Sequence, residues 1–364
     1  MRCKLSDICS YRKGKIEVKR LNNITYISTE NMLPNKGGIT EASSLPSIVL
    51  TQEYRKGDVL VSNIRPYFKK IWQAKYDGGC SNDVLVFTPN PMTDKDFLYY
   101  VLANDEFFLY SMATSKGTKM PRGDKDSIMQ YEIPDIGLDR QRKIASVLKS
   151  LDDKIQLNIA INNNLLEQAS SIYQAWFEDF ILSDRSCPTA WKQGTLAEIA
   201  DITSGKRPPV KSAEKTDTAI IPIVGAASVM GYTTEANHTD KILVTGRVGT
   251  HGVVQRFNLP CWTSDNTLVI TSVFYEYTFQ ILQRINYRAM NRGSTQPLIT
   301  QSDMNKVPIL IPDKETLLKF ETLVGQLMEQ YQANLLENGK LVELRDVLLP
   351  QLMSGELDVS NLCL

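Results

Sequence analysis

The sequence is poor in the residues that build metal sites and disulfide frameworks. It has two histidines, and its six cysteines include no C-x-x-C pair and no framework spacing. Structural zinc needs closely spaced Cys or His ligands, and secreted scaffolds need paired cysteines. We therefore expect no metal site and no disulfides, and reduced thiols in a cytoplasmic protein.

Long hydrophobic runs are also missing. The nearest candidate, residues 219–231, contains Pro222 and Gly225 and is shorter than the roughly 20 residues that a membrane span needs. The N-terminus, MRCKLSD, turns polar at once, unlike a signal peptide. The sequence therefore predicts no contact with a membrane.

Catalytic motifs are missing as well. There is no G-x-x-x-x-G-K-[ST] loop, no G-x-G-x-x-G after a strand and no N-P-P-aromatic motif for a flipped adenine. The Asp152-Asp153-Lys154 run could be mistaken for nuclease carboxylates, but charge runs on helices are usually solvent-exposed. His238 and His251 have no ligand partners at metal spacing. We expect a chain without catalytic residues.

What the sequence does have is a long heptad pattern. Between residues 139 and 180 the seam alternates in steps of four and three, which favours a helix with a long helical partner. Its positions are Ile144, Leu148, Leu151, Ile155, Asn158, Asn162, Leu165, Ala169, Ile172 and Trp176. Adding 176 gives Phe320, Val324, Leu327, Tyr331, Asn334, Asn338, Leu341, Arg345, Leu348 and Leu352. Nine of these ten keep their character, and Arg345 is the exception.

The asparagines lie symmetrically about the middle of the seam. If the two helices pack antiparallel, Asn158 meets Asn338 and Asn162 meets Asn334. Such a polar layer costs stability but fixes register and orientation, because any slip buries unpaired amides. The alternative is two unrelated amphipathic helices whose asparagines face water, since helix stripes are usually core.

The segments before the two helices also repeat. Leu5-Ser6-Asp7-Ile8 matches Leu196-Ala197-Glu198-Ile199, and Ile133-Pro134-Asp135 matches Ile311-Pro312-Asp313. The matches keep their order while the offset drifts, which indicates a duplication of one strand-rich domain and its helix. We predict an α/β (α+β) protein divided into domain 1–134, helix 135–182, linker 183–190, domain 191–312, helix 313–353 and tail 354–364. Within the first domain, residues 96–111 read as one helix.

Charge is zero overall but uneven along the chain. Residues 1–133 carry 19 basic against 15 acidic side chains and residues 187–312 carry 12 against 9, whereas the helical segments 134–186 and 313–364 are acidic. This weakly favours DNA at the two strand-rich domains. Arg and Gln read base edges and Lys mainly holds phosphates, although plain solvent exposure is equally common for such residues. The candidate DNA-binding residues are Lys69, Lys70, Lys116, Lys119, Arg122, Lys206, Arg207, Arg247, Arg256, Arg292 and Gln296.

The chain resembles the specificity (S) subunits of type I restriction-modification systems over nearly its whole length. The resemblance rests on motifs before, within and after the helices. They are Ile133-Pro134, Gln141-Arg142-Lys143-Ile144, the Asn158/Asn162/Leu165 spacing, Ala175-Trp176-Phe177 through Asp179-Phe180, the Gly-Ser-Thr-Gln-Pro run at 293–297 and the tail from Leu348 to Leu357. The second helix has Leu317-Leu318 where the family usually has Glu-Gln.

The resemblance implies two target recognition domains that each read one half of a bipartite, asymmetric site in double-stranded DNA. It implies that the helices set the half-site spacing and dock two methyltransferase (modification) subunits, with restriction subunits in the full complex. S-adenosylmethionine, ATP and magnesium would then belong to those partners, not to this chain. The competing hypothesis is a coiled-coil scaffold with duplicated protein-binding domains, which predicts no salt-dependent DNA affinity.

Overall fold

The structure, a computed structural model, describes residues 2–117, 119–290 and 298–359. The chain forms two compact units, unit 1 (1–158 with 336–364) and unit 2 (159–335). Each long helix therefore contributes one segment to each unit. None of the described helices is long and apolar enough to cross a membrane.

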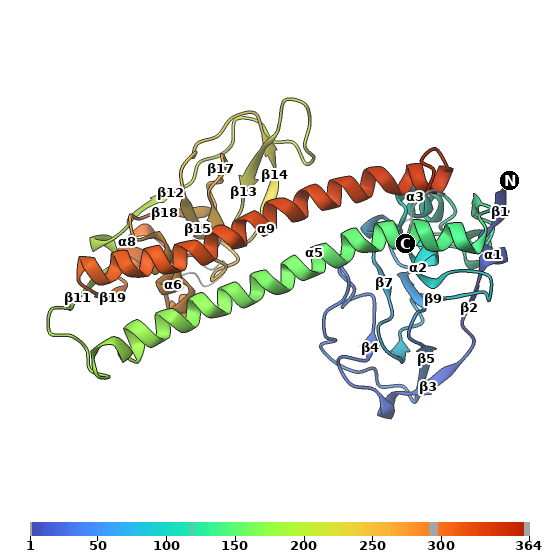
Figure 1. Cartoon of the computed structure of the whole chain (residues 1–364), viewed down its shortest axis with the longest axis horizontal. Coiled ribbons are helices and arrows are strands. Elements are labelled where there is room, and N and C mark those ends of the chain that lie inside the picture. Colours follow the sequence, from blue (N-terminus) through green and yellow to red (C-terminus); the bar gives the residue numbers. More distant parts are fainter. Residues whose placement is uncertain (1, 118, 291–297, 360–364) are drawn as a thin grey trace. The chain divides into compact units, whose positions relative to one another are not determined.

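Unit 1 contains two four-stranded sheets and a small two-stranded one (Figure 1). The first has the order β2 (Cys9–Tyr11), β9 (Val84–Pro89), β6 (Val59–Ser62) and β7 (Ile71–Gln73). The second has the order β3 (Lys15–Glu17), β5 (Leu50–Tyr54), β8 (Gly78–Cys80) and β4 (Tyr26–Ile27), with β4 and β8 parallel. The small sheet pairs β1 (Arg2–Lys4) with β10 (Glu132–Pro134), directly before the first long helix.

Side-chain alternation along β6 explains how unit 1 is layered. Val61 joins a buried cluster with Phe97, Leu148 and Leu352, which come from a short helix and from both long helices. Leu60, its neighbour, points to the opposite face and belongs to a second cluster. Successive side chains of a strand face opposite sides, so β6, which is buried at every position, is covered on both faces.

The short helices of unit 1 are α1 (Leu5–Ile8), α2 (Lys95–Ala103), α3 (Asp105–Ala113) and α4 (Lys125–Ile128), with 3-10 turns η1 (Val18–Arg20) and η2 (Pro66–Phe68). The prediction of a single helix over residues 96–111 is wrong, because the helix is interrupted at Asn104. The backbone there is extended, and the Asn104 side chain accepts a hydrogen bond from the Glu106 amide as the N-cap of α3.

Unit 2 repeats the first sheet of unit 1 strand for strand. Its order is β12 (Asp201–Ser204), β18 (Thr267–Thr271), β15 (Ile242–Gly246) and β16 (Gln255–Phe257). A two-stranded sheet of β11 (Lys192–Thr195) and β19 (Pro308–Ile311) again precedes a long helix. The other sheet differs, with the order β14 (Val229–Thr233), β13 (Ile221–Val224) and β17 (Trp262–Thr263). The helices are α6 (Tyr275–Arg284), α7 (Tyr287–Met290) and α8 (Gln301–Asn305), with the turn η5 (Leu196–Glu198). The predicted duplication is confirmed.

The long helices are α5 (Leu138–Tyr173) and α9 (Lys314–Ser354). α5 continues into one turn of π-helix, η3 (Gln174–Glu178), which is followed by the 3-10 turn η4 (Ile181–Ser183). In unit 1, Asn158 Nδ2 donates to Asn338 Oδ1 at 2.9 Å. In unit 2, Asn334 Nδ2 donates to Asn162 Oδ1 at 2.8 Å. A second contact in each unit gives the direction: Asp152 pairs with Arg345 in unit 1, and Tyr173 lies against Phe320 in unit 2. Within each unit the residue number rises on α5 as it falls on α9, so the predicted antiparallel packing is confirmed within each unit (Figure 1).

Arg345, the exception in the heptad seam, pairs with Asp152, which the sequence analysis placed on a solvent-exposed helix face. Its guanidinium donates to Asp152 at 2.8 Å, and Asp152 also accepts from the Tyr100 hydroxyl at 2.6 Å. The side chains of Asp152 and Arg345 are only 25% and 19% exposed. The expectation of a fully solvated face is therefore wrong for Asp152, which ties both long helices to α2.

Each long helix also holds the N-terminus of a shorter helix. In unit 1, Gln141 of α5 accepts from the Asp94 amide at 2.9 Å, at the start of α2. In unit 2 the position 176 residues on is Leu317, and the same task falls to Glu321 one helical turn later. Its carboxylate accepts from the amides of Glu276 and Tyr277 at 3.0 and 2.8 Å. A carboxylate at a helix N-terminus satisfies orphan N–H groups.

The burial of Glu321 predicts that the stability of unit 2 depends on pH. Burial raises the pKa of Glu321 to about 7, above the roughly 4.3 of an unfolded chain. The folded state thus binds the proton more tightly, so this contribution is present below about pH 4 and lost as pH rises through about 7. We expect the free energy of unfolding of unit 2, measured with urea, to fall by about 2 kcal/mol between pH 5 and pH 8. Glu321→Gln should abolish that fall. Equal pH dependence in both proteins would contradict this.

Candidate nucleic-acid interface

Three loops of unit 1 meet at one edge of the β2-β9-β6-β7 sheet. β6 ends at Ser62 opposite the start of β9, because Ser62 pairs with Val84. The Asn63 amide donates to the Asp83 carbonyl at 2.8 Å, and the Gly123 amide donates to the Asn63 carbonyl at 3.2 Å. Loops 63–70, 81–83 and 114–124 are therefore bound together; we call them loop cluster 1.

Unit 2 builds the same framework from different residues. The Arg247 amide donates to the Asn266 carbonyl at 2.8 Å, and the Ile299 amide donates to the Arg247 carbonyl at 3.0 Å. Arg247 follows β15 as Asn63 follows β6, so the two backbones correspond. Loops 247–254, 264–266 and 298–300 form loop cluster 2. The two clusters thus share a backbone framework and carry unlike side chains.

The predicted residues Lys116, Lys119 and Arg122 lie together on loop cluster 1. The backbones of Lys116 and Arg122 exchange two hydrogen bonds of 2.9 Å, and their side chains are 81% and 57% exposed. Lys116 pairs with Asp124 and lowers the pKa of that carboxyl, while Arg122 contacts Asp83 at 3.0 Å. These surface pairs are weak, so a phosphate or base can compete for either cation.

Lys69 and Lys70 are tied more closely to the protein. Lys69 Nζ lies 2.7 Å from Asp105 of α3, which also holds Lys36 at 2.9 Å. Lys70 Nζ donates to the Thr29 carbonyl at 2.6 Å. Both lysines thus help to position the 63–70 loop in addition to supplying charge.

The unit 2 residues divide into three groups. Lys206 and Arg207 are exposed, and Arg207 lies 3.7 Å from Asp265 at the edge of loop cluster 2, where Arg247 is half-buried. Arg256 is different, because its guanidinium forms two hydrogen bonds to buried Glu276 at 2.6 and 2.7 Å. That pairing argues against Arg256 as a DNA contact. Arg292, Gln296 and the run at 293–297 lie outside the described residues.

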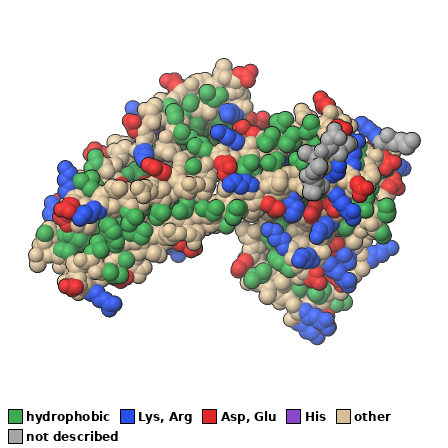
Figure 2. Space-filling view, viewed as in Figure 1, with side chains coloured by type: hydrophobic (Ala, Val, Ile, Leu, Met, Phe, Trp, Pro, Cys, Tyr) green, Lys and Arg blue, Asp and Glu red, His purple; other side chains and the backbone are tan. Residues whose placement is uncertain are grey.

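Sequence reasoning missed three residues of loop cluster 1 and its surroundings. Tyr67 and Phe68 are 49% and 38% exposed at the tip of the 63–70 loop, and Lys36 braces its base. The run Arg65-Pro66-Tyr67-Phe68, with aromatic residues next to a turn-forming proline and basic neighbours, was the available signal. On the face seen in Figure 2, Lys and Arg side chains gather over the sheet region of unit 1.

Neither loop cluster has the arrangement of a metal-dependent active site. Among the described residues, no three His, Cys, Asp or Glu side chains are placed to hold a metal ion. Loop cluster 1 presents cations paired with single carboxylates, and both clusters present backbone amides and neutral polar side chains. This arrangement can bind anions and base edges.

Comparison with known proteins identifies the family of the chain. The family model described as type I restriction modification DNA specificity domain matches residues 1–167 and again 188–345. The chain is 23% identical to the type I restriction enzyme HindI specificity subunit of Haemophilus influenzae, covering 97% of this chain and 98% of that protein. It is 28% identical to the MjaIX specificity subunit of Methanocaldococcus jannaschii, over 73% and 70% of the two chains.

A solved structure shares the fold. It is the S subunit of a type I restriction-modification system from M. genitalium, 18% identical, with a TM-score of 0.58 over 99% of this chain and 96% of that one. The family model matches two segments that together cover most of the sequence, one for each copy of the repeat. The chain therefore belongs to the type I restriction-modification DNA specificity family and is a specificity subunit.

Proposed function

We propose that each loop cluster reads one half of a bipartite, asymmetric site in double-stranded DNA. The observation that carries this proposal is the hydrogen-bonded framework common to Asn63 and Arg247, which presents different side chains in the two units. Direct readout needs side chains at base edges on a fixed backbone. Because the two sets of side chains differ, the two half-sites differ in sequence.

We further propose that the long helices set the spacing between the half-sites, with the asparagine pairs fixing their register. Asn158 is fully buried and Asn334 is 4% exposed, and each is hydrogen-bonded to an asparagine of the other helix. Asn158 also donates to Glu337, whose carboxylate pairs with Lys154 at 3.3 Å. A slip of one turn would bury these amides without partners, at a cost of roughly 1–3 kcal/mol each.

Apolar side chains on the outer faces of the helices favour docked partner subunits. In unit 1, Leu157, Leu344 and Val347 are 55%, 46% and 57% exposed, and in unit 2 Ile159 and Leu318 are 42% and 49% exposed. We propose two methyltransferase subunits as the occupants, with restriction subunits in the full complex. In this account the chain is not itself catalytic, and S-adenosylmethionine, ATP and magnesium are bound by the partners.

Paired substitutions test the division of labour between the loop clusters. We expect Arg122→Ala in unit 1 and Arg247→Ala in unit 2 each to relax or weaken one half-site and leave the other unchanged. A lost bidentate base contact costs about 1–3 kcal/mol of discrimination, whereas a lost phosphate contact lowers the salt slope by about one. The measurement is single-molecule sequencing of methylated sites in cells that express each variant with its modification subunits.

Lys19→Ala is the matched control for that experiment. Lys19 is an exposed lysine of unit 1 on η1, outside loop cluster 1, and its ion pair with Glu17 is on the surface. Its removal should leave the methylated sequence unchanged. If Arg122→Ala and Arg247→Ala altered both halves alike, the assignment of one half-site to each cluster would be overturned.

A further inference from the structure

Loop cluster 1 exposes a pair of adjacent aromatic rings. Tyr67 and Phe68 belong to the 3-10 turn η2 between β6 and β7, with exposures of 49% and 38%. Their ring centroids are 4.6 Å apart at 51°. Large aromatic side chains gain much from burial, so two left in solvent at one loop tip favour an interaction surface.

The backbone presents these rings on a rigid base. Arg65 and Lys69, the residues that flank η2, adopt the left-handed conformation with φ of 50° each, and Pro66 between them is buried. The Asn35 and Lys36 amides donate to the carbonyls of Phe68 and Lys69 at 2.8 and 2.9 Å. A non-glycine residue with positive φ persists only where its surroundings hold it, and such strain collects at binding sites.

The charge around the rings identifies the partner. Lys70 Nζ lies 5.8 Å from the centre of the Phe68 ring, and Lys69 and Lys36 are anchored to Asp105 beside it. The Arg65 amide donates to the Pro121 carbonyl at 2.9 Å, which joins the tip to the loop that carries Arg122. Apolar rings bordered by cations match a duplex, in which phosphates flank stacked bases.

We propose that Tyr67 and Phe68 form an aromatic wedge that inserts at a base step of the half-site read by unit 1. The proposal rests on the proposed function and adds an unstacked step to it. The corresponding loop of unit 2, residues 247–254, has the sequence RVGTHGVV and contains no Phe, Tyr or Trp. Only one of the two half-sites is therefore distorted, which makes DNA deformability part of the specificity of that half.

The test uses the full chain in complex with its modification subunits. The probe is a duplex that carries the methylated site found by sequencing, with 2-aminopurine placed at one position at a time. We expect wild-type complex to raise the fluorescence at one step within a single half-site, because an unstacked 2-aminopurine is brighter. Tyr67→Ala with Phe68→Ala should remove that signal and weaken binding by about 5- to 150-fold, the range for a lost stacked base.

Two further variants separate stacking from charge and from folding. Tyr67→Phe keeps a ring and should retain the fluorescence signal and the affinity. The double alanine variant removes no cation, so its slope of log affinity against log salt should equal the wild-type slope, whereas Arg122→Ala should change the slope or the sequence preference. Because both rings are substantially exposed, the alanine variants should keep the wild-type melting temperature.

The outcomes distinguish this inference from the function on which it rests. If no position brightens and the alanine variants bind normally while Arg122→Ala still alters one half-site, the wedge is overturned and half-site reading stands. If the alanine variants fail to assemble with the modification subunits but the assembled fraction binds DNA normally, the rings are a protein-docking surface and the wedge is again overturned.

Discussion

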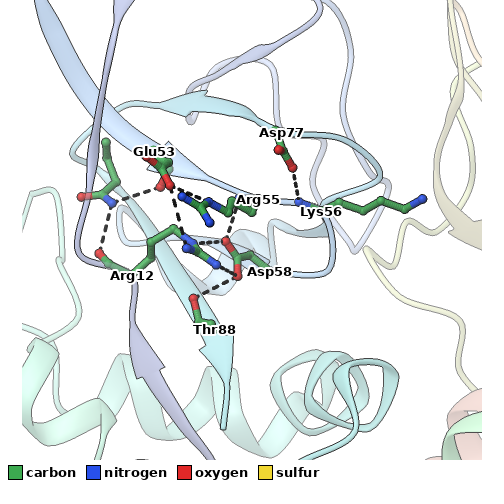
Figure 3. A network of polar contacts seen from close by, with 8 residues as sticks. Arg12, Glu53, Arg55, Lys56, Asp58, Asp77 and Thr88 are labelled. Carbon is green, nitrogen blue, oxygen red and sulfur yellow. Dashed lines mark hydrogen bonds and ion pairs between the residues drawn. The ribbon is translucent and has the colours of Figure 1, made fainter. Parts of the chain in front are cut away.

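Asp58→Ala is expected to destabilise unit 1 selectively and to lower its free energy of unfolding by about 3–5 kcal/mol. The substitution leaves the poorly solvated Arg12 guanidinium without its main partner. Asp58 is 2% exposed and lies at the end of β6 away from loop cluster 1. It binds the Arg12 guanidinium through both carboxylate oxygens and accepts from Thr88 Oγ1 at 2.9 Å and from the Arg55 amide at 2.8 Å (Figure 3). The carboxylate thus joins β9, the turn before β6 and the segment after β2.

Arg12 shows why the loss should be large. Its side chain is 17% exposed, the hydrogen bond to Asp58 raises its pKa, and its other acidic neighbour, Glu53, is 3.9 Å away and already holds Arg55 at 2.8 Å. Without Asp58 the guanidinium stays charged and largely desolvated. Removing one partner of such a pair costs more than the pair contributes.

Hydrogen exchange measured peptide by peptide checks this prediction. In Asp58→Ala, amides of β6 and β9 should exchange faster than in wild type, while those of β15 and β18 in unit 2 keep their wild-type rates. The control is Lys241→Ala, at the position of unit 2 that aligns with Asp58 and is exposed, where we expect a change within about 0.5 kcal/mol. A loss below about 1 kcal/mol in Asp58→Ala would show that the network is not a main support of unit 1.

The helices could be predicted from sequence because a heptad seam has regular spacing, and the duplication could be predicted because the matched motifs keep their order in the two copies. The heptad seam keeps its seven-residue period over ten positions, because a shift of one residue would turn its side chains away from the partner helix. The period can therefore be read from the sequence. The asparagine pairing followed from the same arithmetic, and the hydrogen bonds of Asn158 and Asn334 agree with it. The order of the strands in the sheets was not predicted, because it depends on pairing between segments that are distant in the sequence.

Side-chain partners other than the asparagine pairs could not be predicted, because they depend on contacts between distant segments that follow no regular spacing. Arg345 looked like a defect in the seam until Asp152 and the Tyr100 hydroxyl were found beside it. Arg256 looked like a DNA contact, yet it is held by Glu276 across 20 residues of sequence. A cation in a loop reads the same in sequence whether it faces a carboxylate or solvent.

The candidate site was predicted only in part for the same reason. Lys116 and Arg122 are adjacent because two strands of backbone hydrogen-bond, which their spacing did not require. Tyr67 and Phe68 were passed over because exposed aromatic residues carry no periodic signal. Their position beside the loop that carries Arg122 depends on the hydrogen bond from the Arg65 amide to the Pro121 carbonyl, which the sequence does not indicate.

Inserting four residues in both long helices at the boundary between the two units is expected to lengthen the unread gap of the methylated site. The bases of both half-sites should stay the same, so the altered protein should methylate a different set of sites. The boundary falls between Asn158 and Ile159 on α5 and between Leu335 and Leu336 on α9. Four residues inserted in each helix at these points leave Asn158 with Asn338 and Asn162 with Asn334, because each pair lies within one unit. Four helical residues add about 6 Å, which corresponds to roughly one or two base pairs at about 3.4 Å each.

The matched insertion is the sharpest form of this test. A four-residue insertion in α5 alone leaves α9 unmatched, so its effect on the spacer is confounded by lost packing. A control insertion of four residues in the exposed linker 183–190 changes the chain length by the same amount without lengthening either helix. It should leave the spacer unchanged.

Single-molecule sequencing of methylated sites in cells expressing the matched-insertion chain with its modification subunits measures the spacer directly. We predict both half-sites unchanged and the unread gap longer by one or two base pairs. Altered half-site letters around a constant gap would contradict the claim that the paired helices measure the distance between the two halves.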